Sequence, residues 1–190
     1  MQPPMTVTAL VPIRSFAGMS RLAGALPADR RAALMLRLAG RTTDALRRAG
    51  VDVAVVTGDA SVGEWASQQN FRLVDEPDPP GLNAAAAAGI AQADGAWMVV
   101  HADLPLITAG DVVAVRHALA SATHVLAPSH DGGTSLIGGS SPTFPFAYGV
   151  GSFRRHLAAA PNAAVLIRPG LALDLDRPSD LDAMRRLGFR

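Results

Sequence analysis

Asp103 is the residue whose position most directly suggests chemistry. It follows the apolar run 97–102 and precedes Leu104-Pro105, so it lies at the end of a predicted strand, on a turn that a proline restricts. A carboxylate presented in this way can offer a hard oxygen ligand to Mg²⁺. The alternative is that Asp103 only caps a turn or a helix.

A second pair of carboxylates occurs near the carboxyl terminus. Asp174 and Asp176 are two residues apart, at the end of the apolar segment 171–175. Side chains at this spacing share one face of a strand, so we expect both carboxylates on the same side. They are further candidates for binding a cation, and for Asp176 the alternative is local pairing with Arg177.

Arginines lie in the loop that follows the first apolar run, 7–13. Arg14 and Arg21 flank a segment with glycine and serine, and together the backbone amides and guanidinium groups can wrap a triphosphate. The sequence contains no lysine, which removes lysine as a catalytic residue. A surface loop with two solvated arginines is the alternative interpretation.

Three further positions are candidates for binding phosphate or a nucleoside. Asn83 follows a proline-rich loop, and Thr134 and Ser135 follow two glycines, although each could simply begin a helix or form a turn. The segment 148–152 places a flexible turn just before a predicted helix, whose N-terminus is a natural anion site. The five histidines show no metal-ligand spacing.

Apolar runs and helical periodicity predict the elements that position these residues. The predicted strands are 7–13, 51–57, 71–74, 96–101, 123–127 and 171–175, and the predicted helices are 27–49, 59–69, 82–93, 111–120, 152–160 and 179–187. Strands that are apolar on both faces and alternate with helices indicate one α/β domain, 1–190, with three α/β/α layers and a mostly parallel twisted sheet. The glycine- and serine-rich segment 129–141 predicts a loop or hairpin, and so an antiparallel excursion within 129–150.

The overall composition indicates a soluble globular protein. Of its 190 residues 49% are hydrophobic and 17% charged, and the net charge of +1 offers no electrostatic footprint for nucleic acid. The absence of cysteine excludes disulfides and thiolate metal sites. We find no signal-peptide pattern and no membrane-spanning apolar stretch, so we expect a cytoplasmic protein that does not bind membranes.

The topology predicts where these candidates meet. Ligands of an open parallel sheet bind at the carboxyl ends of its strands, so the arginines and carboxylates that follow the strands should share one rim. Arginines and carboxylates on one rim suit a polyphosphate and a magnesium ion.

Segments along almost the whole chain, in the same order, resemble the 2-phospho-L-lactate guanylyltransferases of coenzyme F-420 biosynthesis and their phosphoenolpyruvate- and 3-phosphoglycerate-using relatives. The segments are VPIR (11–14), SRL (20–22), GLNAA (81–85), HADLPL (101–106), GTSL (133–136), FAYGVGSF (146–153) with His156, and PGLALDLDRPSDL (169–181). The resemblance implies a fold like that of the nucleotide-diphospho-sugar transferases.

The resemblance also implies a reaction and its residues. GMP would pass from GTP to 2-phospholactate, phosphoenolpyruvate or 3-phosphoglycerate, with Mg²⁺ as cofactor and pyrophosphate as the second product. The implied catalytic residues are Arg14, Arg21 and Asp103; the nucleotide-binding residues are Pro12, Arg14 and Asn83; the acceptor-binding residues are Thr134, Gly149 and Ser152; and the metal ligands are Asp103 and Asp176.

The sequence departs from the family pattern at two places. Arg14 and Met19 stand where the family carries lysines, and 132–135 has one glycine-threonine step in place of two. Two alternative functions therefore stay open, a nucleotidyltransferase with another nucleotide or acceptor and an inactive nucleotide-binding relative. The expected partners are GTP and a small phosphorylated carboxylate, and the apolar segment 143–150 is a candidate homodimer interface.

Overall fold

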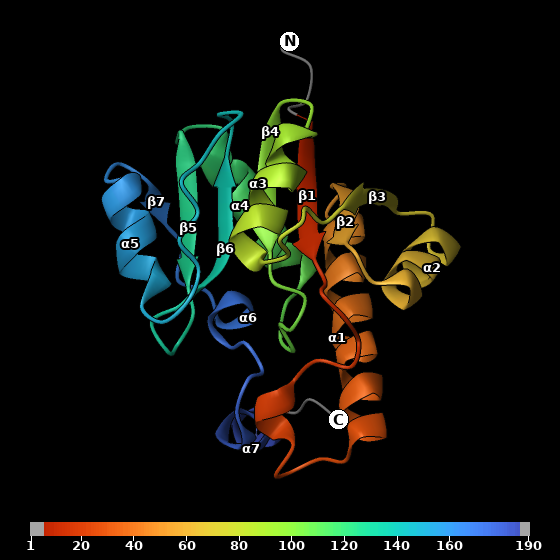
Figure 1. The fold of residues 1–190 in the computed structure, drawn as a ribbon. Helices are drawn as coiled ribbons and strands as arrows, with labels where there is room; N and C mark the ends of the chain where they lie inside the picture. The colour runs from red at the N-terminus through yellow and green to blue at the C-terminus, as the bar shows by residue number, and fades with distance from the viewer. Residues whose placement is uncertain (1–5, 187–190) are drawn as a thin grey trace.

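A computed structural model describes residues 6–186 and shows strands flanked by helices (Figure 1). The elements in chain order are β1 (Val7–Pro12), the 3-10 helix η1 (Ser20–Leu22), α1 (Ala28–Arg48), β2 (Asp52–Thr57), α2 (Ala60–Gln68), β3 (Arg72–Asp75), α3 (Leu82–Ala91), β4 (Ala96–Val100), α4 (Ala109–Leu119), β5 (His124–Pro128), β6 (Thr134–Gly139), α5 (Ser152–Ala159), β7 (Ala164–Val165), α6 (Pro169–Ala172) and α7 (Pro178–Arg186).

The seven strands form one mixed sheet in the order β3-β2-β1-β4-β6-β5-β7. The first four strands of the chain are parallel to their neighbours in the block β3-β2-β1-β4, and β7 is parallel to β5. Only β6 runs antiparallel to both of its neighbours, β4 and β5. The predicted mostly parallel sheet and the predicted antiparallel hairpin are both confirmed.

Helices cover both faces of the sheet, because its central strands are apolar on both sides. In β1 the side chains of Ala9 and Val11 join a core cluster with α1, α2 and α4, whereas Leu10 points to the opposite cluster with α3. Gly89 lets α3 lie close to the sheet, since a Cβ atom there would be 2.9 Å from Cγ of Leu10. The three-layer prediction is therefore confirmed.

A third cluster lies below the carboxyl edge of the parallel strands, where η1 and α7 sit beside the start of α1 (Figure 1). It buries Leu22 and Leu38 together with Leu173, Leu175 and Leu181. The predicted strand 171–175 is wrong: 169–172 forms α6, and the leucines that follow pack into this cluster instead of extending the sheet. The edge position beside β5 is taken by β7, a two-residue strand that the sequence did not predict.

The apolar segment 143–150 contributes to the protein's own core. Phe144 is buried, and its ring and that of Phe146 contact Trp97 with centroids 6.2 and 5.9 Å away. These side chains are therefore engaged within the chain, although Val150 is 93% exposed. The homodimer stays a prediction. None of the helices within residues 6–186 has the length and apolar character that crossing a membrane requires.

Candidate functional site

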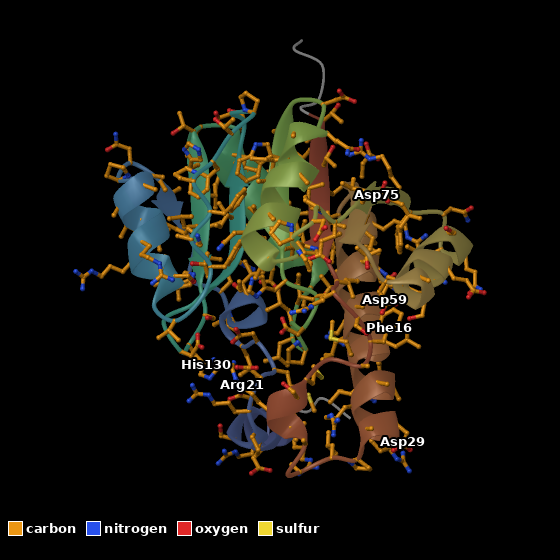
Figure 2. All side chains as sticks on the ribbon, in the orientation of Figure 1. Phe16, Arg21, Asp29, Asp59, Asp75 and His130 are labelled. Carbon is orange, nitrogen blue, oxygen red and sulfur yellow. The ribbon has the colours of Figure 1, made fainter. Side chains whose placement is uncertain are left out.

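A cavity of about 320 Å³ opens at the carboxyl edge of the central strands. It is lined by residues from the η1 loop, the turn after β4, the β5–β6 hairpin, the loop before α5 and the segment before α7. Figure 2 shows Arg21 and His130 below this edge of the sheet. Of the residues predicted from sequence, the lining includes Arg21, Asp103, Thr134, Gly149, Ser152 and Asp176.

Asp103 follows β4, and its side chain lies beside that of His101. Its side chain is 30% exposed, but Oδ1 is buried without a hydrogen-bond partner and lies 4.0 Å from Nδ1 of His101. Burial raises the pKa of Asp103, which His101 partly offsets and which the carboxylates of Asp176 and Asp131 raise further. The ionised form of Asp103 is therefore disfavoured in this turn.

Asp174 is a second carboxylate of the same kind. Its side chain is 15% exposed, and Oδ1 has no hydrogen-bond partner, although Nδ1 of His130 lies 3.5 Å away. The pKa of Asp174 is raised to about 6, mainly by burial and also by the charges of Asp103 and Asp131. A nearby cation would relieve the repulsion that raises both pKa values.

Asp176 is held from both sides. Its carboxylate forms an ion pair with Arg21, 155 residues earlier in the sequence, so this pair replaces the local one considered with Arg177. Its backbone N–H donates to Oδ2 of Asp180 at 3.0 Å, and the N–H of Arg177 donates to the same oxygen at 2.7 Å. Both Asp174 and Asp176 line the cavity without the strand from which their shared face was predicted.

Hydrogen bonds and an ion pair connect the segment 174–180 to the turn after β4 and to His130. The N–H of Leu175 donates to the backbone carbonyl of Asp103 at 3.0 Å, and Asp180, which is buried, also lies 3.4 Å from Nε2 of His130. Asp180 appeared in the sequence analysis only as part of the segment 169–181 and was given no role of its own there. Asp131 was missed altogether; its Oδ1 accepts from Ser129 Oγ at 2.6 Å and shapes the hairpin turn.

The carboxylates fit a divalent cation that is shared with a substrate. Among residues 6–186 there is no group of three or more histidine, aspartate or glutamate side chains arranged to enclose a metal. Two buried carboxylate oxygens, on Asp103 and Asp174, nevertheless lack partners. Mg²⁺ is commonly bound by one or two carboxylates and completed by water and substrate phosphates, which matches this incomplete set of ligands.

The hydroxyl-bearing residues Thr134 and Ser152 form another part of the cavity wall. Ser152 begins α5, and its Oγ donates to Oγ1 of Thr134 at 3.3 Å. Thr134 also lies 2.9 Å from Nδ1 of His156, a fully buried ring whose Nε2 accepts from the N–H of Ala147 at 2.8 Å. Gly149 lies in the same loop with a φ of +123°, a conformation that favours glycine. The predicted acceptor residues are thus neighbours.

Asn83 connects this wall to α3. Its Oδ1 accepts from the backbone N–H of Tyr148 at 2.7 Å, so it fixes the loop that carries Gly149. The ring of Tyr148 stacks on Phe146, with an interplanar angle of 8°, and burial raises its pKa. A contact between Asn83 and a nucleoside stays a prediction.

Arg14 lies in a different cavity from Arg21. This second cavity, of about 380 Å³, is lined by Arg14 with Asp59, Glu76 and Asp78 among others. Pro12 is the last residue of β1, directly above the loop that carries Arg14. Figure 2 shows Asp59 and Phe16 on this side of the molecule, away from His130.

Met19, where the family carries lysine, has an apolar role. It adopts a left-handed conformation with φ 59° at the start of η1, and its side chain packs against the third core cluster, which includes Leu22. The position therefore supports the loop by packing, and the cations in the two cavities are arginines.

The comparisons with known proteins agree with this geometry. The family described as "Guanylyl transferase CofC like" matches residues 7–184. The chain belongs to this family. It is 35% identical to a phosphoenolpyruvate guanylyltransferase of Rubrobacter xylanophilus, over 97% of this chain and 96% of that one. It is 36% identical to a 3-phospho-D-glycerate guanylyltransferase of Phenylobacterium zucineum, over 85% and 81% of the two chains.

The fold of this guanylyltransferase family member is also similar to solved structures. A protein of Desulfovibrio desulfuricans G20 assigned to the nucleotide-diphospho-sugar transferases superposes with a TM-score of 0.80, over 96% of this chain and 88% of that one. At 17% identity this likeness concerns the fold alone. The expected nucleotide-diphospho-sugar-transferase-like fold is confirmed.

Proposed function

We propose that this protein transfers GMP from GTP to the phosphate group of a phosphorylated three-carbon acid. Its family membership and relatives named for phosphoenolpyruvate and 3-phospho-D-glycerate support this activity. The observation that carries the proposal is the single cavity in which unpartnered carboxylate oxygens face an arginine and two hydroxyl groups. Such a cavity suits two phosphorylated reactants and a bridging cation.

The reaction is a substitution at the α-phosphorus of GTP. An oxygen of the acceptor phosphate forms a bond to the α-phosphorus, and the bond from that phosphorus to the oxygen bridging α and β breaks. The bonding electron pair leaves with pyrophosphate, and the GMP unit remains joined to the acceptor phosphate by a phosphoanhydride bond. Little covalent work falls to the protein, which must align the two phosphates and offset their charge.

The bound cation is Mg²⁺ in this proposal, and it supplies charge neutralisation to the phosphates. Asp103 is its central ligand, joined by Asp176 as the resemblance implies. The unpartnered Oδ1 of Asp174 adds a third candidate ligand, because Asp176 already pairs with Arg21. The raised pKa values of Asp103 and Asp174 are what a site prepared for a cation would have before the cation binds.

The side chains divide between the two reactants. Thr134, Gly149 and Ser152 bind the phosphate or carboxylate of the acceptor, with hydroxyl and amide donors. Arg21 faces the triphosphate near Asp176, and Arg14 reaches it from the neighbouring cavity. Pro12 and Asn83 contact the nucleoside in this proposal. A cytoplasmic location, a role in coenzyme F-420 biosynthesis and assembly into a homodimer belong to the same proposal.

Pyrophosphate release tests the activity. Purified protein is incubated with Mg²⁺ and GTP, and phosphoenolpyruvate, 2-phospholactate and 3-phosphoglycerate are supplied separately. Release that needs one of these acids supports the proposal and identifies the acceptor. The same assay is repeated with ATP or CTP in place of GTP, and release with one of these but not with GTP would assign a different nucleotide. No pyrophosphate release from folded protein with any nucleotide and acid would indicate an inactive relative.

Asp103→Asn is expected to reduce turnover by at least about 100-fold, because the amide cannot offer the cation a charged ligand. Its thermal stability should not fall, since the substitution removes repulsion among carboxylates. Asp182→Asn is the matched control: Asp182 pairs with Arg185 on the exposed face of α7 and should leave turnover unchanged. Wild-type turnover in Asp103→Asn would overturn the metal assignment.

A further inference from the structure

His156 is a buried titratable group whose two ring nitrogens both have fixed partners. The N–H of Ala147 can only donate a hydrogen bond, and it lies 2.8 Å from Nε2. Nε2 must therefore offer its lone pair and carry no proton. In a neutral imidazole the proton then belongs to Nδ1, which lies 2.9 Å from Oγ1 of Thr134.

The surroundings of the ring keep it neutral. The pKa of His156 is lowered to about 4, mainly by burial and also by the charges of Arg155 on α5 and of His101 after β4. The other groups facing it are the rings of Phe144 and Tyr148. The phenol of Tyr148 stays protonated because burial raises its pKa. No anionic group among these contacts would favour a charged ring.

The neutral ring decides what Thr134 can do. Nδ1–H of His156 donates to Oγ1 of Thr134, and the hydroxyl of Ser152 donates to the same oxygen at 3.3 Å. Both lone pairs of Oγ1 are then used, and its proton is left for the cavity that Thr134 lines. If the two hydroxyls exchange roles, the proton of Ser152 is left for the cavity instead. In either arrangement one donor faces the ligand.

We infer that His156 is a positioning residue: because its Nδ1–H donates to Thr134 and cannot accept from it, one hydroxyl proton of the Thr134–Ser152 pair stays available to the acceptor molecule. This proton can be donated to an oxygen with a free lone pair, such as an ionised phosphate or carboxylate oxygen. The identity of the bound molecule rests on the proposed function, whereas the direction of the hydrogen bonds does not.

Two substitutions separate the two nitrogens of the ring. In His156→Asn the side-chain amide can place N–H near the position of Nδ1 and restore the donor to Thr134, while losing the contact with Ala147. In His156→Gln the amide reaches the position of Nε2 and can accept from Ala147, while losing the donor to Thr134. The two variants therefore differ mainly in the contact on which the inference depends.

Binding of phosphoenolpyruvate without GTP is measured by calorimetry for both variants and for the wild type. We expect His156→Asn to stay within about threefold of the wild-type Kd and His156→Gln to weaken binding by about tenfold, the effect of one hydrogen bond. The Kd for GTP should change in neither variant. Equal Kd values for the two variants, a parallel loss of GTP binding, or no binding of phosphoenolpyruvate by the wild type would overturn the inference.

Nitrogen-15 NMR of the wild-type protein tests the tautomer without any ligand. The resonances of His156 are identified by their loss in His156→Gln, and they should show a protonated Nδ1 and an unprotonated Nε2 from pH 5.5 to pH 8. A ring protonated on Nε2 would overturn the inference even if the protein is an active guanylyltransferase. Conversely, the expected tautomer and affinities in a protein that releases no pyrophosphate would leave the inference standing and the proposed activity refuted.

Discussion

The aspartates of the cavity differ in whether their carboxylate oxygens have partners within the protein. Asp174 and Asp103 keep buried oxygens without partners, which leaves their negative charge for a ligand. Asp176 and Asp131, in contrast, are engaged by Arg21 and by Ser129. The pKa of Asp131 is lowered by the Ser129 hydrogen bond, whereas that of Asp174 is raised by burial. Neighbouring carboxylates thus differ in their surroundings: Asp176 and Asp131 have partners within the protein, whereas an oxygen of Asp103 and one of Asp174 have none.

Asp174→Asn should change how stability depends on pH. The pKa of Asp174 is about 6 in the folded protein, above its ordinary value of 3.8, so the folded state favours the protonated form. This contribution is fully present below about pH 4 and is lost as pH rises through 6. Without metal, the amide should therefore stabilise the protein at pH 8, by up to about 3 kcal/mol, and give no gain at pH 4.

Chemical denaturation of both proteins in EDTA at the two pH values measures this difference. Adding Mg²⁺ in place of EDTA is the control: it should stabilise the wild type at pH 8 more than at pH 4, because the carboxylates must ionise to bind the ion. A variant that is less stable than the wild type at pH 8 would contradict the strained state assigned to Asp174.

At the scale of elements, the close approach of α3 to the sheet positions Asn83 beside the loop that carries Tyr148 and Gly149. The helix is built from small residues, and Gly89 lies against Leu10 of β1. The contact matters for the site because the first turn of the same helix carries Asn83, whose side chain holds the backbone of Tyr148.

Gly89→Ala should destabilise the fold. The new Cβ would lie 2.9 Å from Cγ and 3.1 Å from Cδ1 of Leu10, and overpacking of this kind costs about 1–3 kcal/mol, more than the helix propensity gained. Gly63→Ala in α2 is the matched control, since nothing lies within 4 Å of its added Cβ, and it should stabilise by up to about 1 kcal/mol. Urea unfolding midpoints compare the two; equal effects would remove the packing explanation.

The elements also show how far the sequence could be interpreted. Strands such as β1 and β4 were predictable because they are apolar on both faces, and the α5 helix because its apolar face is periodic. The segment 171–175 was misassigned because Leu173 and Leu175 alternate as they would in a strand, while their actual partners are leucines of η1 and α7. Two-residue β7 has too little pattern to predict.

The site was predictable in composition but not in its contacts. The carboxyl-edge rule predicted that Arg21, Asp103 and Asp176 share one rim, and they line one cavity, whereas Arg14 lies in the other cavity. His156 contacts Thr134, which lies 22 positions away in the sequence, and Arg21 pairs with Asp176, which lies 155 positions away. No local pattern specifies such partners. Their roles in binding and catalysis stay predictions.

Across the whole molecule, the two reactants are assigned to two parts of one sheet. The parallel strands β1 to β3 carry the loops with Arg14 and the second cavity, and the antiparallel hairpin with α5 carries the hydroxyl wall. Asp103 follows β4, which lies between β1 and β6. In our account, GTP enters from the first part and the acceptor from the second, and they meet at Asp103.

The most direct test of guanylyl transfer follows the fate of labelled GTP. The protein is incubated with Mg²⁺, the acceptor acid and GTP labelled with ³²P at either the α- or the γ-phosphate, and the products are separated. The account predicts that the α label joins the acceptor through a phosphoanhydride bond while the γ label leaves as pyrophosphate. Transfer of the γ label to the acceptor, or no transfer of either label by folded protein, would contradict it.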